Sequence, residues 1–187
     1  MNSPIDNSLQ KTKALEKRYG KIELPKQGPW NEAINLLLSH KSVRSYKPDL
    51  LPDGTLETLL AAAQSAATSS NLQLWSLVAI TDPDKKRELA KVAGNQKHIE
   101  QCPLFLVWLA DLSRNQRMGE EEGVEMEVMP FVETFLVAAI DAALAAQNAV
   151  IAAESLQLST VYIGAMRNNP EKVAELLQLP SEVFGVF

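Results

Sequence analysis

The chain has 187 residues, a length that suits one domain with a substantial hydrophobic core. Its composition is ordinary for a soluble globular protein, with 46% hydrophobic and 22% charged residues. The net charge of -5 argues against broad binding to nucleic acid or to anionic membranes, because both need a basic surface.

The single cysteine, Cys102, excludes an intramolecular disulfide bond. It stands at the entry to an apolar run, which favours a small buried side chain over a catalytic nucleophile. The polar segment 1–20 lacks the apolar region of a secretory signal. The longest apolar tract, 134–153, is interrupted by polar residues, which argues against a membrane span. We therefore expect a cytoplasmic protein.

Residues 1–29 are predicted to form an N-terminal extension and linker, and residues 30–187 the main domain. Ser8–Arg18 is predicted to be a short charged helix. The proline and glycine content of Leu24–Pro29 is typical of a linker. Trp30–Leu38 is predicted to be the next helix, with Pro29 as its start signal.

A polar cluster, Ser39–Tyr46, follows this helix and contains His40, Lys41, Ser42 and Arg44. Cations supply charge, hydroxyl groups supply donors, and an arginine can fork onto two oxygens, so the cluster is suited to hold an anion. The alternative is a solvated helix C-terminus, where basic residues are favoured by the helix dipole. The cluster alone does not separate these interpretations.

A second polar segment, Thr68–Trp75, lies between two apolar elements. Before it, Tyr46–Pro48 is predicted to be extended, and Asp53 is predicted to cap a helix over Leu56–Ala66. After it, Ser76–Thr81 is predicted to be a strand. The polar segment is either an ordinary hydroxyl-rich loop or a set of neutral donors and acceptors for a polar heterocycle.

The middle of the chain alternates between helix and strand. Pro83–Ala93 is predicted to be a surface helix capped by Asp82, followed by a break and a short helical turn near His98. Pro103–Ala110 is apolar on both faces, which predicts a central strand of a covered sheet. Asp111–Met129 is polar and acidic, and we expect Glu120–Glu122 within it to be a solvated loop or lid.

Pro130–Leu156 is the longest predicted helix, and it is apolar nearly all round. In a domain of this size such a helix is expected to pack on the core and also on a second subunit, which favours a homodimer. Ser159–Gly164 is predicted to be a strand, Asn169–Leu177 a helix, and Val183–Phe187 the opening of a further strand. A strand that begins at the last residues indicates a fragment of a longer chain.

Motifs for other chemistries are missing from the sequence. It contains no Walker-type loop, no G-x-G-x-x-G and no G-x-S-x-G. Neither histidine has a second histidine or a carboxylate at metal-ligand spacing, so we predict no metal site. His98 taken alone indicates a surface or packing residue more than a ligand.

Five segments together resemble the nitroreductase / flavin reductase family, above all its oxygen-insensitive NADPH nitroreductase and flavin reductase P branch. They occur in family order from about residue 30 to the end of the chain. They are His40–Arg44, Thr68–Trp75, Gly94–His98, Ala146–Ala149 together with Ala152–Leu156, and Val161–Asn169.

The resemblance implies an α+β fold, with a mixed, mostly antiparallel sheet wrapped by helices in an intertwined homodimer. The long helix from Pro130 would form much of the dimer interface. Two FMN molecules would lie at that interface, each touched by both subunits. The flavin would carry out the hydride chemistry, so no side chain is assigned a catalytic role.

The resemblance also assigns roles to individual positions. The FMN phosphate and ribityl chain would be held by His40, Lys41, Ser42 and Arg44. The flavin would be contacted, partly from the partner subunit, by Thr68, Ser70, Asn71, Leu72 and Gln73. Its edge would meet Gln96 and His98. The ring would be lined by Tyr162, Ile163, Gly164 and Ala165.

The implied activity is an FMN-dependent NAD(P)H oxidoreductase working by ping-pong hydride transfer. Its acceptors would be planar electrophiles such as nitroaromatics, quinones or flavins. The family often has arginine at the position of Lys41, and it continues past Phe187 with a Lys-x-Arg segment that also binds phosphate. The rival hypothesis is therefore a degenerate or truncated FMN-binding or dimerisation protein without reductase activity.

Overall fold

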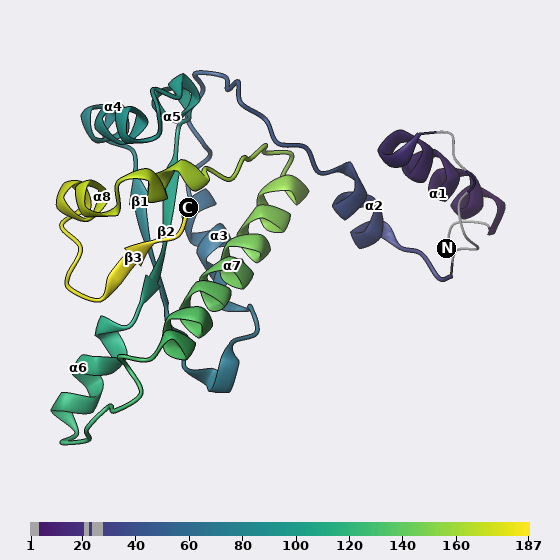
Figure 1. Cartoon of the computed structure of the whole chain (residues 1–187). Coiled ribbons are helices and arrows are strands. Elements are labelled where there is room, and N and C mark those ends of the chain that lie inside the picture. Colours follow the sequence, from purple (N-terminus) through teal and green to yellow (C-terminus); the bar gives the residue numbers. More distant parts are fainter. Residues whose placement is uncertain (1–3, 21–22, 24–27) are drawn as a thin grey trace.

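The computed structural model describes residues 4–20, 23 and 28–187. Within them the chain forms eight α-helices, two short 3₁₀ helices and one three-stranded sheet (Figure 1). The helices cover both faces of the sheet, and the α+β class predicted from the sequence is confirmed.

The sheet has the order β1-β2-β3, and both pairings are antiparallel. Its strands are β1 (Trp75–Ile80), β2 (Phe105–Asp111) and β3 (Val183–Gly185). Each lies within two residues of its predicted start. The centre of β2 is buried on both faces, as its unbroken apolar run predicted. Beyond β3, Trp108 and Phe187 are still joined by a backbone hydrogen bond of 2.8 Å.

Helices lie on both faces of the sheet (Figure 1), and the side chains of β2 alternate between these two layers. Phe105, Val107 and Leu109 pack with α4 (Pro83–Val92), α5 (Lys97–Gln101) and α8 (Pro170–Leu177). Trp108 packs on the opposite side with α3 (Thr55–Gln64) and α7 (Val132–Ser155). The prediction for α7 is confirmed within two residues of each end.

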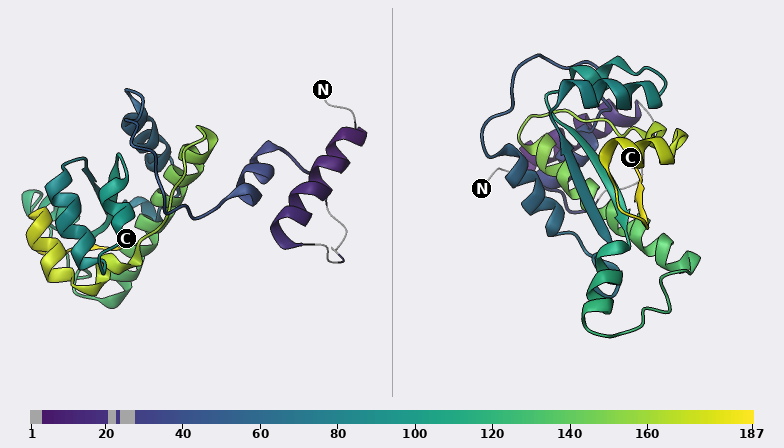
Figure 2. Two further views of the ribbon diagram at one scale, coloured as in Figure 1. Left: turned by 90° about the horizontal axis from the view of Figure 1, so that it is seen from above. Right: turned by 90° about the vertical axis from the view of Figure 1, so that its left-hand side faces the viewer.

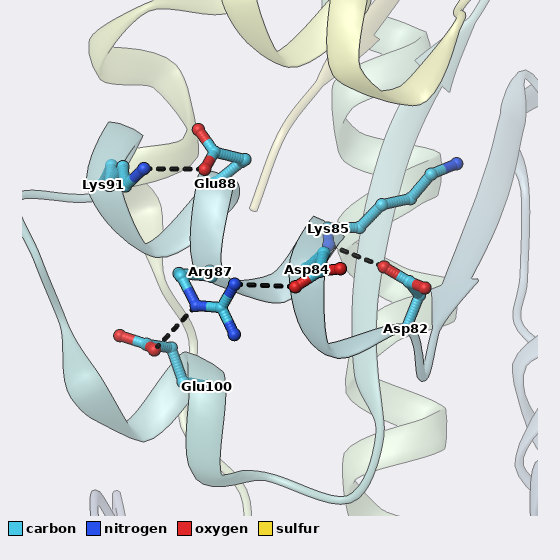
Figure 3. Close-up of polar contacts among 7 residues, drawn as sticks. All are labelled: Asp82, Asp84, Lys85, Arg87, Glu88, Lys91 and Glu100. Carbon is cyan, nitrogen blue, oxygen red and sulfur yellow. Dashed lines mark hydrogen bonds and ion pairs between the residues drawn. The ribbon is translucent and has the colours of Figure 1, made fainter.

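Helix α4 begins where the sequence predicted. The carboxylate of Asp82 accepts the backbone N–H of Lys85 at 2.7 Å, which caps the helix after β1 (Figure 3). Surface ion pairs follow along the helix, from Arg87 to Asp84 and from Lys91 to Glu88, each at 2.6 Å (Figure 3). Exposed pairs of this kind add little stability, so the cap and the buried face define the helix.

Helix α7 carries small side chains on the face that it turns to the sheet and α3. Ala138, Ala142, Ala145 and Ala146 have no exposed surface, so the helix backbone lies close to its neighbours. By length and composition alone, α7 could cross a membrane, with a mean hydropathy of 1.8 over its most apolar window. The core helix of a globular protein meets the same test, and here α7 packs against β1 and β2.

Two N-terminal helices lie apart from the sheet, as Figure 1 and the left-hand view of Figure 2 show. Helix α1 (Pro4–Tyr19) includes the predicted Ser8–Arg18, and Gly20 follows it with a φ of 82°. Helix α2 (Glu32–Ser39) begins two residues later than predicted, because Asn31 rather than Pro29 supplies the cap. Residues 24–27 of the predicted linker lie outside the described residues.

Three sequence predictions are wrong. Asp53 does not cap α3. Instead Gly54 precedes the helix with a φ of 78°, and the Thr55 hydroxyl donates to the carbonyl of Pro52 at 2.6 Å. Ser159–Gly164 is not a strand, since it makes only an isolated parallel bridge between Thr160 and Ser42 before the 3₁₀ helix η2 (Gly164–Asn168).

The third correction concerns the acidic segment after β2. Glu120 and Glu121 lie in the last turn of a helix, α6 (Ser113–Glu121), and not in a loop, although Glu120, Glu121 and Glu122 are exposed as predicted. Asp111 explains the helix start, because its buried carboxylate accepts the Ser113 hydroxyl at 2.8 Å and the Arg114 N–H at 3.2 Å. Burial raises the pKa of Asp111. Hydrogen bonds from Ser76, Ser113 and Arg114 lower it by more, so the pKa lies below its ordinary value.

Candidate functional site

The predicted phosphate cluster begins where α2 ends. The Nδ1 atom of His40 lies 2.6 Å from a carboxylate oxygen of Glu154, in the last turn of α7. The Arg18 guanidinium of α1 donates to the carbonyl of His40 at 2.7 Å. Three helices therefore meet at this histidine, and the orientation of its ring is set by Glu154. Glu154 lies within the segment Ala152–Leu156, one of those that carry the family resemblance, but the sequence alone assigned it no role.

Lys41, Ser42 and Arg44 follow on an exposed, extended segment. The bridge to Thr160, with a Val43 N–H to Thr160 carbonyl bond of 3.0 Å, holds this segment beside the stretch that leads to Tyr162. None of the ion pairs among the described residues uses Lys41 or Arg44. Two cations thus remain available to an anionic ligand.

The predicted flavin turn, Thr68–Gln73, contains the 3₁₀ helix η1 (Ser69–Asn71) and lies at the start of β1. Ser70, Asn71, Leu72 and Gln73 are exposed, and Thr68 is half-buried. Two residues of α6 anchor the turn, because Asn115 donates to the Leu72 carbonyl at 3.1 Å and Arg114 donates to the Gln73 carbonyl. Sequence patterns did not reveal these anchors, since no helix was predicted between β2 and α7.

The turn and the cationic cluster lie at different places along α7. Asp141 contacts the turn and Glu154 contacts the cluster, thirteen residues further along the helix. A rise of about 1.5 Å per residue places these two contacts about 20 Å apart. One chain therefore does not bring both groups of predicted residues around the same small ring system.

A cavity of about 500 Å³ lies between the cluster segment, β2, α7 and the stretch 157–163. Three predicted residues, His98, Tyr162 and Ile163, line it, together with large side chains such as Tyr46, Trp108 and Phe187. Gln96 lies two residues before His98, and Gly164 and Ala165 follow Ile163, but none of the three lines the cavity. The volume is within the range of about 300–1,000 Å³ that is typical of ligand pockets.

Two polar atoms around this cavity lack hydrogen-bond partners within the described part of the chain. They are Nε2 of His98 and Oγ1 of Thr160. Buried polar atoms are normally satisfied, so each is suited to pair with a polar ligand. The residues present fit a heterocycle with several acceptors and donors, such as a flavin.

The pKa shifts of the side chains around the cavity favour their neutral forms. Burial raises the pKa of Tyr162 to about 12, and burial together with Cys102 raises the pKa of Tyr46 to about 12, against a smaller lowering by Arg44. Burial, and next the charge of Arg44, lowers the pKa of His98 below 6.5. Burial also raises the pKa of the Cys102 thiol, which is consistent with a buried packing role.

Comparison with known proteins identifies the family of the chain. The model of the nitroreductase family matches residues 37–187, so the chain belongs to the nitroreductase family. It is 46% identical over 158 residues to an FMN reductase (NADPH) of Bacillus subtilis, covering 84% of this chain and 64% of that protein. It is 39% identical to an oxygen-insensitive NADPH nitroreductase of Salmonella typhimurium, covering 82% of this chain and 62% of that protein.

Solved structures give the same result for the fold. The NfrA1 nitroreductase from B. subtilis superposes with a TM-score of 0.82 and 46% identity, covering 83% of this chain and 64% of that one. The NADPH:FMN oxidoreductase from Vibrio harveyi complexed with NAD+ gives 0.77 and 37%, covering 84% and 66%. The predicted family resemblance is confirmed. The chain spans slightly less than two thirds of the length of the curated relatives named above.

The lowered pKa of His98 predicts a pH-dependent stability. Unfolded His98 binds a proton near pH 6.5 while the folded side chain resists it, so the free energy of unfolding should fall as pH decreases from 7 to 5.5. The slope from this residue is at most about 1.4 kcal/mol per pH unit. Urea unfolding across this range should show a smaller slope in His98→Gln than in the wild type. Equal slopes would contradict the assignment.

Proposed function

We propose that this chain provides the FMN site of an NAD(P)H-dependent oxidoreductase that acts as a homodimer. The observation that carries the proposal is the division of the predicted site along α7, with free cations at its C-terminal end and a polar turn near its middle. A site shared between two subunits joins these halves. The relatives named as NADPH-dependent reductases of FMN give the cofactor and the electron donor.

The FMN phosphate would bind at His40, Lys41, Ser42 and Arg44. A phosphate monoester carries close to two negative charges at neutral pH, and the unpaired cations of Lys41 and Arg44 are suited to neutralise them. Arg44 is suited to fork onto two oxygens, whereas Lys41 offers a point charge. Glu154 would hold the His40 ring toward the same anion.

The flavin ring would lie beside the cavity, near Tyr162, Ile163, Gly164 and Ala165. Gln96 and His98 would face its edge, with Nε2 of His98 as a donor or acceptor. The turn residues Thr68, Ser70, Asn71, Leu72 and Gln73 would approach from the partner subunit. When bound, FMN would accept a hydride from NAD(P)H and pass it to an acceptor. The apolar lining would exclude water from that ring.

The exposed face of α7 supports the homodimer. Val132, Leu136, Ile140 and Leu144 recur every fourth residue and are 73, 47, 56 and 43% exposed. Such a stripe of large apolar side chains marks an interaction surface. A two-fold axis across the stripe would pair the two helices antiparallel and cover both stripes. Helices α1 and α2 also project from the body (Figure 2).

The same proposal covers domains, substrates and location. Residues 30–187 would form the FMN-binding domain, and residues 1–29 an extension that reaches the partner. Acceptors would be small planar electrophiles such as nitroaromatics, quinones or flavins, since these stack on a flavin ring. A cytoplasmic location suits an NAD(P)H-dependent enzyme, and a net charge of -5 gives no reason to expect nucleic acid as a partner.

The purified chain supplied with FMN should be yellow, and NADPH should bleach its flavin absorbance without oxygen. A yellow protein that NADPH does not bleach would favour the rival hypothesis of an FMN-binding protein without reductase activity. A protein that stays colourless after FMN is added would contradict both hypotheses.

Substitution of Arg44 tests the phosphate cluster. Arg44→Ala should weaken FMN binding by about 1.5–3 kcal/mol, the weight of a hydrogen bond to a charged group. The dissociation constant, from quenching of flavin fluorescence, should therefore rise roughly tenfold to a hundredfold. Lys91→Ala removes a surface cation on α4 and is the control (Figure 3). Equal affinity in the wild type and Arg44→Ala would show that Arg44 is only a cation at a helix end.

Substitution of Ile140 tests the dimer. Ile140→Glu places a charge in the middle of the apolar stripe, so sedimentation at micromolar concentration should show a shift from dimer to monomer. Val124→Glu is a matched control, because Val124 is also 56% exposed but follows α6. A dimer that persists unchanged in Ile140→Glu would exclude this face as the interface.

A further inference from the structure

The carboxylate of Asp141 lies on α7 and has no exposed surface. Its Oδ1 atom accepts the backbone N–H of Ser69 at 3.0 Å, and its Oδ2 atom accepts the backbone N–H of Leu74 at 3.3 Å. These two N–H groups bracket the turn that the proposed function assigns to the flavin. We propose that Asp141 is a positioning residue, which holds this turn in its ligand-binding shape without touching the ligand.

Packing does not explain a carboxylate at this position. The neighbouring positions on the same face of α7 are alanines such as Ala138, Ala142 and Ala145, each without exposed surface. Burying a carboxylate is costly unless it is hydrogen-bonded or paired. Among the ion pairs of residues 4–20, 23 and 28–187, none includes Asp141. Its described hydrogen bonds go to the two ends of the turn, so these bonds offset the burial.

The turn needs such a restraint. Ser70, Asn71 and Gln73 have φ values of 50, 54 and 52°, in the left-handed region that L-residues adopt at a cost. Backbone of this kind persists only where surrounding contacts over-determine it, and it is concentrated at functional sites. A flexible chain would not keep three such residues within four positions.

The restraint acts from two sides. Asp141 holds the N–H groups at the ends of the turn from the interior, and Asn115 and Arg114 hold the carbonyls of Leu72 and Gln73 from α6. The side chains of Ser70, Asn71 and Gln73 remain exposed. The backbone of the turn is thus rigid before a ligand binds, while its side chains remain free to contact the ligand. Binding then does not have to order the backbone, which avoids that loss of conformational entropy.

Asp141→Asn tests this inference with almost no change of shape. The amide has one acceptor oxygen and presents an NH₂ group to the other backbone N–H, so one of the two tethers should be lost. Amide hydrogen exchange, measured by NMR, should accelerate at Ser69 or Leu74 relative to the β2 core. FMN binding should weaken by about tenfold, the weight of one hydrogen bond to a charged group.

Asp82→Ala is the matched control. It also removes a carboxylate that accepts a backbone N–H, but at the opposite end of β1 (Figure 3). It should leave exchange at Ser69 and Leu74, and FMN affinity, unchanged. If Asp141→Asn is poorly folded, Asn115 offers a second variant. Asn115→Ala removes the hydrogen bond to the Leu72 carbonyl, and it should also speed amide exchange in the turn and weaken FMN binding, by a smaller factor.

The inference rests on the proposed function, and the experiment separates the two. A wild-type chain that fails to bind FMN would overturn the proposed function, while exchange at Ser69 and Leu74 would still report on the tether. A wild type that binds FMN, with unchanged exchange and affinity in folded Asp141→Asn, would overturn the positioning role and leave the proposed function intact. Faster exchange together with weaker binding would support both.

Discussion

Helix α7 has two apolar faces, and the described chain covers only one of them. The alanine face lies against β1, β2 and α3, where small side chains let the backbones approach closely. The opposite face carries Val132, Leu136, Ile140 and Leu144 in contact with solvent. Exposing such a surface is unfavourable in water, so the sequence of α7 favours a second covering element.

The same helix fixes the distance between the two halves of the proposed site. It is 24 residues long, and its contacts with the turn and the cationic cluster lie more than half of that length apart. A rigid helix does not shorten to bring them together. The proposed homodimer would meet both constraints, because a second subunit would cover the aliphatic face and would supply the other half of each site. Interface and site are then consequences of one element.

His40 shows how the ends of the chain depend on this helix. Its carbonyl is bound by Arg18 from α1, and its ring is bound by Glu154 from α7. The bridge between Ser42 and Thr160 adds the segment that leads to Tyr162. Elements far apart in the sequence therefore converge at the end of the molecule where the proposed phosphate site lies. Helix α1 is thus linked to that site by the hydrogen bond from Arg18 to His40.

Local signals in the sequence predicted most elements of the fold. Asp82 is a correct cap because its partner, the N–H of Lys85, is three residues away and needs no tertiary context. The prediction of β2 from its apolar run was correct, because a central strand that is buried on both faces needs apolar side chains on both. The prediction that Asp53 caps α3 was wrong. Gly54, with a φ of 78°, occupies the N-cap position, and the Thr55 hydroxyl bonds to the carbonyl of Pro52 at the helix start.

Long-range contacts were not predictable in this way. Residues 159–164 have strand-like composition, but a strand needs a partner along its length, and only Ser42 pairs with this stretch. The cluster and the turn were visible in the sequence as polar segments, and the resemblance assigned them roles, whereas their anchors Glu154, Arg114 and Asn115 were not found. Asp141 was noted only as a polar interruption of an apolar tract. Its partners are about 70 residues away in the sequence, so only the folded structure reveals them.

The most direct test of the shared site is complementation between two defective chains. Arg44→Ala affects the cluster and Asn71→Ala affects the turn, and we expect each homodimer to bind FMN weakly. After the two chains are mixed and exchange subunits, each mixed dimer should contain one site with neither substitution. FMN titration should then recover wild-type affinity at about a quarter of all sites. If both halves of a site belonged to one chain, mixing would restore no tight binding, and the account would be contradicted.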